Sequence, residues 1–309
     1  VSKIKRIIST AFQQYKELFD SPKLTEQQRT QLQNVTPDMD NVTAQSALQE
    51  LSCYLHLYYG KKVLILLDEY DTPMQEAYIH GYWDEFTAFI RGLFNSTFKT
   101  NRHLERAIMT GITRVSKESI FSDLNNLTVI TTTSERYSDC FGFTEKEVQE
   151  LCSKYDRSFE ETKAWYNGYE LSVVEAQKLK VYAMYNPKSV VDAMLSGIFD
   201  NYWNQTETYE ALKAYICMNF DGLKDSVIKI LAGDRVQINT GTFSNDMTSF
   251  QSRDDILTLL VHLGYLSYHW PDKIVAIPNK EVSQEYVNAI STMDWNEVIH
   301  SVEASRKLL

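Results

Sequence analysis

The stretch that most constrains the fold of this chain runs from Lys61 to Pro73 and reads KKVLILLDEYDTP. Five apolar residues, Val63–Leu67, lead directly into the adjacent carboxylates of Asp68 and Glu69. An uninterrupted apolar run, in place of apolar–polar alternation, favours a strand that is covered on both faces, as in a parallel α/β sheet. The sequence therefore predicts a buried parallel strand with two acidic side chains at its carboxyl end.

Helical and strand patterns on both sides of this stretch predict an α/β domain. Leu48, Leu51, Leu55 and Tyr58 share one face of a helix ahead of the strand, and Gly60 is placed to end that helix. The other predicted elements are helical residues 1–35 broken at DSPK, a helix within 82–98, a strand in LERAIMTGI, a strand at Leu127–Thr133 and a helix starting at the Thr144–Glu147 capping box. This alternation is typical of a doubly wound sheet.

The pattern changes after about residue 155. Short helices are predicted in SFEETKAWYNGY and in YNPKSVVDAMLSG, where Asn186 is the cap, Pro187 lies in the first turn and Gly197 follows the end. Further on, a helix, a strand, a tight turn at PD, a returning strand and a final helix predict a winged-helix-like fold. We therefore expect three parts: an α/β domain over 1–154, a helical region over 155–232 and a winged-helix-like domain over 233–309.

Composition narrows the classes of protein and of partner. The net charge of -10 argues against a broad phosphate-binding surface. The four cysteines are far apart and form no CxxC pair, which favours buried thiols in a reducing compartment. No window approaches the roughly 18 apolar residues of a membrane span, and no signal peptide is found. We expect a cytoplasmic protein with no membrane partner.

The acidic pair suggests a specific chemistry. In P-loop nucleoside triphosphatases an apolar strand ends in an acidic residue that holds Mg²⁺, and in one large branch the next residue is a glutamate that polarises the attacking water. The strand must be rigid, because the water has to lie in line with the γ-phosphate. VLILLDE fits this pattern, with Asp68 as the magnesium residue and Glu69 as the base. The alternative is a strand that simply ends in a solvated acidic turn.

The phosphate-binding partner of this motif is not found in the sequence. A P-loop needs GxxxxGK[ST], whose backbone N–H groups and lysine hold the phosphates. No glycine begins such a pattern, and YYGKKV lacks both the upstream glycine and the hydroxyl residue. The scattered histidines have no ligand spacing, so nucleotide-bound magnesium is the metal that we expect. Taken alone, the sequence predicts half of a nucleotide site.

A second group of candidate residues lies in RAIMTGITRVSKESIFSDLNNL, which runs from Arg106 to Leu127. A strand ending at Thr110 beside the acidic strand would place a hydroxyl near the γ-phosphate as a sensor. Arg114 follows where a cation would reach transition-state charge. The alternatives are a strand-end hydroxyl bonded to backbone for Thr110 and an ordinary surface salt bridge for Arg114.

Several motifs, in order, give the chain a resemblance to a known family. They are KKVLILLDEYDTP, MTGITRVSKESIFSDLNNLTV, CFGFTEKEV, WYNGY, YNPKSV, NYW, GYLSY and IPNKEV. Together they resemble the bacterial AAA-ATPase-like family over roughly residues 40–300. In this family a P-loop ATPase module is commonly followed by a PD-(D/E)XK nuclease-like domain. The resemblance implies a partial P-loop NTPase-like parallel sheet with helices, then a helical region and a winged-helix-like domain.

The resemblance also implies which residues form the site. Asp68 and Glu69 correspond to the acidic pair, and Asp71 belongs to the same motif. Arg114, Lys117 and Asn125 belong to the second motif, near the nucleotide. Family members carry a stretch similar to RPRRFGKT that supplies the phosphate loop, which we expect before Val1, and a nuclease-like region, which we expect after Leu309.

The leading hypothesis is an ATP-binding and ATP-hydrolysing module that uses Mg²⁺ and acts as a nucleotide-driven switch for an attached domain, inactive as this fragment. The alternative is a non-catalytic regulatory module that binds protein or nucleic acid and retains an ATPase-like shape. A third reading makes the full protein a nucleic-acid-processing enzyme with this piece as its switch. The hairpin of the winged part would enter a DNA groove, but its few basic residues, Lys273 and Lys280, favour protein contact or internal packing. WYNGY would stack a base, and packing on a neighbouring domain is the favoured alternative.

Overall fold

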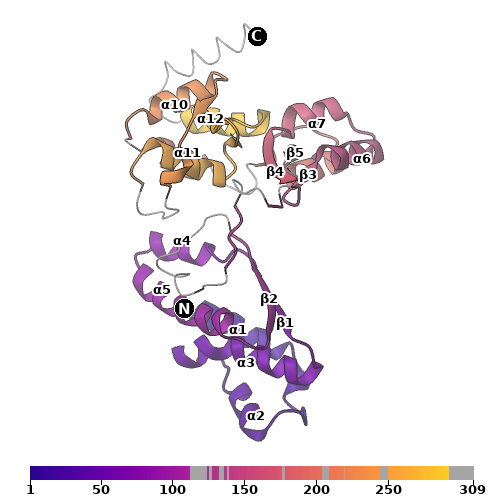
Figure 1. The fold of residues 1–309 in the computed structure, drawn as a ribbon, viewed down its shortest axis with the longest axis vertical. Coiled ribbons are helices and arrows are strands. Elements are labelled where there is room, and N and C mark those ends of the chain that lie inside the picture. Colours follow the sequence, from indigo (N-terminus) through magenta and orange to yellow (C-terminus); the bar gives the residue numbers. More distant parts are fainter. Residues whose placement is uncertain are drawn as a thin grey trace. The chain divides into compact units, whose positions relative to one another are not determined.

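The chain forms two compact units in a computed structural model. The structure describes residues 1–111, 124, 127–131, 136–137, 139–175, 178–203, 209–218, 220–243 and 250–291. Unit 1 comprises Val1–Thr128 and unit 2 comprises Val129–Leu309. The described residues of unit 1 form one hydrophobic core and those of unit 2 form two, so each unit is described separately. Figure 1 shows the ribbon of the chain. The division into 1–154, 155–232 and 233–309 stays a prediction.

Unit 1 consists of helices around a short parallel sheet. Its elements are α1 (Ser2–Gln13), η1 (Lys16–Leu18), α2 (Glu26–Gln33), α3 (Asn41–Tyr59), β1 (Val63–Leu67), α4 (Thr72–Ile79), α5 (Trp83–Phe94), the π-helical segment η2 (Asn95–Lys99) and β2 (Leu104–Met109). The central helix α3 contacts α1, η1, β1, α5 and η2. The predicted end of α3 is confirmed, because Gly60 adopts the left-handed conformation with φ of 70°.

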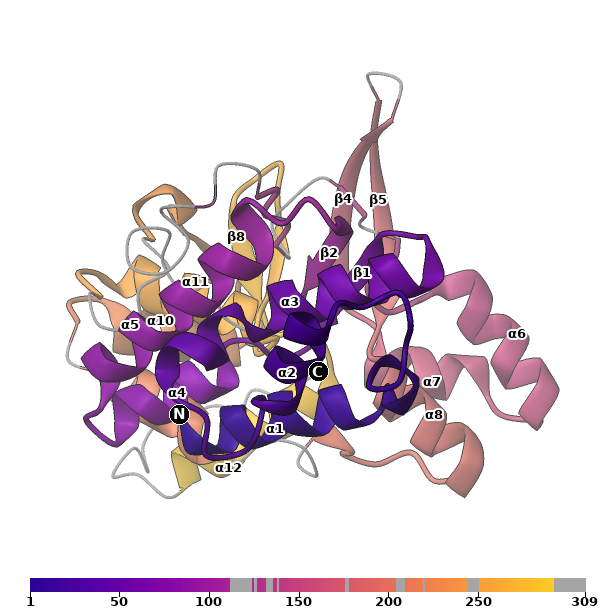
Figure 2. The ribbon, with the colours of Figure 1, turned by 90° about the horizontal axis from the view of Figure 1, so that it is seen from below.

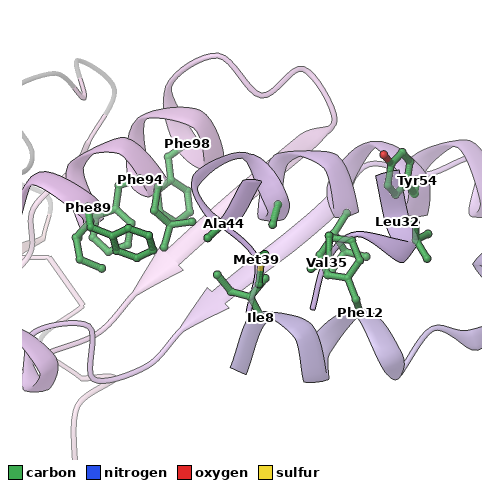
Figure 3. Packing of buried hydrophobic residues seen from close by; sticks show 14 of the residues in the cluster. Ile8, Phe12, Leu32, Val35, Met39, Ala44, Tyr54, Phe89, Phe94 and Phe98 are labelled. Carbon is green, nitrogen blue, oxygen red and sulfur yellow. The ribbon is translucent and has the colours of Figure 1, made fainter. Parts of the chain in front are cut away.

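The core of unit 1 is built mainly from helix side chains (Figure 3). Ile8 and Phe12 of α1 pack with Leu32, Val35 and residues of the central helix. The buried face of α5 follows the predicted helical spacing, and its members Phe86, Ile90, Leu93 and Phe94 are each at most 5% exposed. Because this packing lies beside β1, it fixes the strand that carries the acidic pair.

β1 and β2 pair in parallel, as the sequence predicts, with Leu67 opposite Met109 at their carboxyl ends. The prediction that β1 is covered on both faces is wrong for this structure. Leu64, Leu66 and Ile108 are 67%, 76% and 54% exposed, whereas Ile65 and Leu67 pack against the core. An apolar run is typical of buried parallel strands, but the described helices of unit 1 pack against only one face of this sheet. We call Leu64, Leu66 and Ile108 the open face.

The predicted third strand, Leu127–Thr133, is wrong over the part that the structure describes. Leu127–Thr131 has no regular hydrogen-bonded structure, and residues 132 and 133 lie outside the described residues. Valine and threonine favour strands only where a neighbouring strand and a packed face are available. The sheet described in unit 1 therefore has the order β1–β2.

Unit 2 combines helices with two antiparallel sheets. Its elements are β3 (Phe143–Thr144), α6 (Glu145–Tyr155), α7 (Phe159–Tyr166), β4 (Tyr169–Glu175), β5 (Lys178–Tyr185), α8 (Pro187–Ser196), α9 (Tyr209–Ile216), α10 (Leu223–Leu231), β6 (Val236–Gln237), η4 (Thr240–Thr242), α11 (Arg253–His262), β7 (Ser267–His269), β8 (Ile274–Ala276) and α12 (Lys280–Ser291). The sheets have the orders β3–β5–β4 and β6–β8–β7.

Several local predictions in unit 2 are confirmed. The Thr144–Glu147 capping box begins α6. Asn186 caps α8, Pro187 lies at its start and Gly197 follows it in the left-handed conformation. The order helix, strand, strand, helix is present as α11, β7, β8 and α12. These agreements follow from short-range signals, each of which lies within one turn of the element that it bounds.

The prediction of a helical region over 155–232 is wrong where β4 and β5 form strands. β4 and β5 pair in antiparallel register from Tyr169 opposite Met184 to Glu175 opposite Lys178, and Figure 2 shows them as a long hairpin. The hairpin includes charged and polar residues among apolar ones, so its alternation is weak in the sequence. No helix within the described ranges is both long and apolar enough to cross a bilayer.

Candidate functional site

The acidic pair lies where the two parallel strands end. The strand ladder continues one step past each strand, because Thr110 N–H donates to the Leu67 carbonyl at 2.9 Å and Tyr70 N–H donates to the Thr110 carbonyl at 3.0 Å. Asp68 and Glu69 therefore begin the loop after β1 directly beside Thr110, which follows β2. Ligand sites of parallel sheets lie at these carboxyl ends.

Asp68, Glu69 and Thr110 form one hydrogen-bonded group. The Thr110 hydroxyl donates to Asp68 Oδ1. The backbone N–H of Glu69 lies 3.1 Å from Asp68 Oδ1 and 3.3 Å from Thr110 Oγ1, so both oxygens accept from it. The structure thus brings together three of the residues that the sequence predicts for the site. The alternative for Thr110, a hydroxyl bonded to backbone, is present in part, because the hydroxyl accepts the Glu69 N–H while it also donates to the Asp68 carboxylate.

The backbone at Glu69 has an unusual conformation. Its φ of 51° lies in the left-handed region, which costs an ordinary side chain roughly 1–2 kcal/mol. Such conformations concentrate at functional sites, where the surrounding structure holds them in place. Here the two flanking strand bonds and the two acceptors for the Glu69 N–H hold it. Both carboxylates of the pair are exposed, so water and a solute can reach them.

Asp71 has a different environment from the acidic pair. It is only 1% exposed, and its backbone carbonyl accepts the N–H of Met74 at 2.9 Å in the first turn of α4. A Cβ added at Gly111 would lie 2.5 Å from Asp71 Oδ1 and 2.8 Å from Tyr70 Cε1. The loop after β1 therefore packs tightly on the residue that follows Thr110, and Asp71 is buried against Gly111 rather than facing solvent.

Gly111 is a site residue that the sequence reasoning missed. The usable signal is a glycine immediately after a strand end, which often marks a close approach of another segment. That signal gives the position of a close contact but does not identify the contacting residue. Only the parallel pairing of β1 with β2 puts Asp71 against it.

The residues present fit a magnesium ion that is shared with a nucleotide. Mg²⁺ in such sites is bound through one or two carboxylates together with phosphate oxygens and water, without a cage made of protein ligands alone. Asp68 supplies an exposed carboxylate with a hydroxyl beside it. No cluster of three or more His, Cys, Asp or Glu side chains with metal-binding arrangement occurs among the residues that the structure describes.

Three predicted residues lie outside the described part of the chain. Arg114, Lys117 and Asn125 lie within 112–123 and 125–126, which are not among the described residues, so their places relative to Asp68 stay predictions. The site described here consists of Asp68, Glu69, Asp71 and Thr110, with Gly111 as a packing partner.

Comparison with known proteins agrees with the resemblance seen in the motifs. Residues 2–121 match the AAA-ATPase-like family, described as a predicted AAA-ATPase, and this range includes β1, β2 and the site. A curated relative, the "Uncharacterized protein in vnfD 5'region" of Azotobacter chroococcum mcd 1, is 32% identical over 164 residues. The match covers 52% of this chain and 30% of the relative, so the chain spans about a third of that protein's length. No solved structure matches the chain.

Proposed function

We propose that residues 2–121, which match the AAA-ATPase-like family, contribute the magnesium and water side of an ATP-hydrolysing site. The observation that carries the proposal is the group formed by Asp68, Glu69 and Thr110 at the carboxyl ends of two adjacent parallel strands. Nucleotide hydrolysis needs a carboxylate that holds Mg²⁺ and a residue that orients the attacking water. Carboxylates at the end of one strand, beside a hydroxyl at the end of the next, supply groups of this kind.

Each residue of the group has a distinct proposed role. Asp68 would hold Mg²⁺, which neutralises charge on the β- and γ-phosphates when bound. Glu69 would orient and polarise the attacking water, and its held backbone restricts where its carboxylate can lie. Thr110 would orient the Asp68 carboxylate through its hydrogen bond and would sense the γ-phosphate. Arg114 is proposed to stabilise transition-state charge.

The phosphate-binding part of the nucleotide site is proposed to come from a segment outside these 309 residues. The open face supports this, because parallel sheets are normally covered on both sides and Leu64, Leu66 and Ile108 are not. A strand and helix carrying a glycine-rich loop would complete such a sheet and bring backbone N–H groups to the same edge as Asp68. On this proposal, residues 1–309 alone hydrolyse no ATP.

Unit 2 is proposed to pass nucleotide-driven movement to an attached domain, with α11, β7, β8 and α12 as a winged-helix-like part. Direct binding of DNA by this part is disfavoured by one contact. Lys280 Nζ lies 4.0 Å from the centre of the Trp165 ring, so one of the two basic side chains considered for that role is engaged within unit 2. Internal packing, the alternative already favoured for these residues, fits this contact.

The proposal is tested by Glu69→Gln in the natural full-length protein. Loss of the water-polarising carboxylate should reduce ATP turnover at least about 100-fold, the usual scale for a general base, while nucleotide binding is retained. Turnover is measured by phosphate release, and binding by the anisotropy of a fluorescent ATP analogue with Mg²⁺.

Glu105→Gln is the matched control. Glu105 is an exposed glutamate on β2, near the opposite end of the strand from Thr110, so its substitution should leave both turnover and binding unchanged. Undiminished turnover in Glu69→Gln would mean that the base lies elsewhere. Nucleotide binding that is absent from the unmodified full-length protein would favour the alternative, a non-catalytic regulator with an ATPase-like shape.

A further inference from the structure

Unit 2 contains two hydrophobic cores. The first core is formed by α6, α7, β5 and α8, and it includes Val148, Tyr166 and Val190. The second is formed by α9 to α12 with β6 to β8, and it includes Leu260 and Tyr286. Residues 197–203 follow α8 and are the described part of the segment that leads from the first core to the second.

A buried carboxylate joins these cores. Glu281, in the first turn of α12, is 0% exposed. Its Oε1 accepts three hydrogen bonds: from the Ser189 hydroxyl of α8 at 2.9 Å, from Tyr202 N–H at 2.8 Å and from Trp203 N–H at 2.7 Å. One carboxylate oxygen of the second core is therefore hydrogen-bonded both to a helix of the first core and to the segment that connects the two cores.

A second glutamate repeats the arrangement one turn later. Glu285 is 1% exposed, and its Oε1 accepts a hydrogen bond from the side-chain amide of Asn201. Oε2 of Glu281 and Oε2 of Glu285 are buried and have no hydrogen-bond partner among the described residues. Burying an ionised carboxyl group without a paired cation costs free energy of folding. An apolar side chain would avoid this cost, so these two glutamates call for an explanation beyond core packing.

Several short motifs that carry the family resemblance meet at this point. In WYNGY, the Tyr166 hydroxyl donates to the Asp200 carbonyl at 3.0 Å, and a Cβ at Gly168 would lie 1.7 Å from the Pro278 carbonyl oxygen. The Tyr169 hydroxyl donates to the carbonyl of Gly264, in GYLSY, at 2.8 Å. Ser189 belongs to YNPKSV, the 201–203 segment is NYW, and Glu281 belongs to IPNKEV.

We propose that Glu281 couples the two cores of unit 2, so that they unfold and move as one body while its three hydrogen bonds are intact. WYNGY, YNPKSV, NYW, GYLSY and IPNKEV are then parts of one joint. The proposal stands independently of the nucleotide site, because every contact in it lies within unit 2.

The charge surroundings of Glu281 support a joint that depends on its few hydrogen bonds. Burial raises the pKa of the Glu281 carboxyl, against the lowering effect of its three donors, and the nearby Glu285 raises it further. Among the residues that the structure describes, the titratable groups that face it are Glu285 on α12, Tyr166 on α7 and Tyr169 on β4. None of them is a cation, so the three donors are what stabilise the ionised form.

The test is hydrogen exchange of the 309-residue chain, read by mass spectrometry. In Glu281→Ala the amides of Tyr202 and Trp203 lose their acceptor, so their exchange should speed up at least about tenfold. In a urea series, α8 and α11 should lose protection at the same urea concentration in the unmodified chain and at different concentrations in Glu281→Ala. Glu281→Gln keeps an oxygen acceptor and should behave like the unmodified chain on both readouts.

Unchanged exchange at Tyr202 and Trp203 in Glu281→Ala would overturn the proposal, as would loss of protection by α8 and α11 at one shared urea concentration. If Glu281→Ala does not fold, Ser189→Ala decides. It removes one of the three donors and should speed exchange at 202–203 by a smaller factor, with both cores folded. Exchange at 202–203 that is unchanged in Ser189→Ala would then overturn the proposal.

Discussion

Glu69 shows at the scale of one residue how the site departs from ordinary folding preferences. The sequence predicts its place after β1 from the apolar run, and the structure puts it there. Its left-handed backbone could not be predicted, because nothing in DEYD marks one of these residues for positive φ. The conformation arises from the parallel pairing of β1 with β2, which brings Thr110 to the Glu69 N–H.

Glu69→Gly tests whether this conformation is imposed on the side chain. Glycine adopts positive φ without the steric cost, and this gain offsets its larger loss of entropy on folding. The free energy of unfolding, measured by urea denaturation, should stay the same or rise by up to about 1 kcal/mol. In Glu105→Gly, on an ordinary strand, it should fall by about 0.5–1 kcal/mol. Equal losses in both variants would contradict a strained Glu69.

The two strands of unit 1 show at the element scale what sequence periodicity supplies and what it lacks. Val63–Leu67 and Leu104–Met109 were predicted as strands and are strands. Periodicity records that a face is apolar, but it does not say whether the covering layer is present. Leu64 and Leu66 are apolar and exposed. The strand itself was therefore predicted correctly, whereas the packing of a second layer on it was not.

Leu66→Thr tests the proposal that a further segment covers the open face. In the 309-residue chain it should change the free energy of unfolding by no more than about 0.5 kcal/mol, because Leu66 is exposed. In the natural full-length protein it should cost about 1 kcal/mol or more, because a methyl-rich side chain is lost from a buried layer.

Ile65→Ala is the comparison, since Ile65 lies on the packed face of the same strand. It should destabilise both forms by about 1–3 kcal/mol. A negligible effect of Leu66→Thr in the full-length protein would show that the open face stays exposed there. Denaturant unfolding of these four variant proteins and of the two unmodified forms is sufficient to decide.

The β4–β5 hairpin and the predicted strand Leu127–Thr133 are two further failures of prediction at the element scale. The hairpin was read as part of a helical region, although Tyr169–Glu175 is rich in β-branched and aromatic residues. Leu127–Thr131 has the same kind of composition and forms no strand. The difference is the presence of a paired neighbour, which is a tertiary property that local composition does not encode. Caps, by contrast, are local, and those at Thr144 and Asn186 were predicted correctly.

At the scale of the whole molecule, the stability of unit 2 should depend on pH in a defined direction. Burial raises the pKa of both Glu281 and Glu285 above the value of 4.5 that an unperturbed glutamate has. The folded chain therefore binds more protons than the unfolded chain above about pH 4.5. This stabilising contribution is complete below that pH and is lost as the pH rises through the raised pKa values.

Glu281→Gln should make this dependence shallower, because glutamine does not ionise and keeps an oxygen acceptor. The measurement is the free energy of unfolding of unit 2 by urea at a series of pH values above 4.5. Glu147, whose pKa is lowered by the Thr144 N–H, acts in the opposite direction and below this window, so it does not obscure the comparison. An unchanged pH slope in Glu281→Gln would contradict the raised pKa of Glu281.

The whole-molecule account rests on the proposal that Asp68, Glu69 and Thr110 form one part of a nucleotide site. ATP hydrolysis with Mg²⁺, measured side by side for residues 1–309 and for the natural full-length protein, tests it most directly. The account predicts turnover by the full-length protein that is abolished in Glu69→Gln, and no turnover by residues 1–309. Robust hydrolysis by residues 1–309 that survives Glu69→Gln would contradict both the missing phosphate-binding half and the role of Glu69.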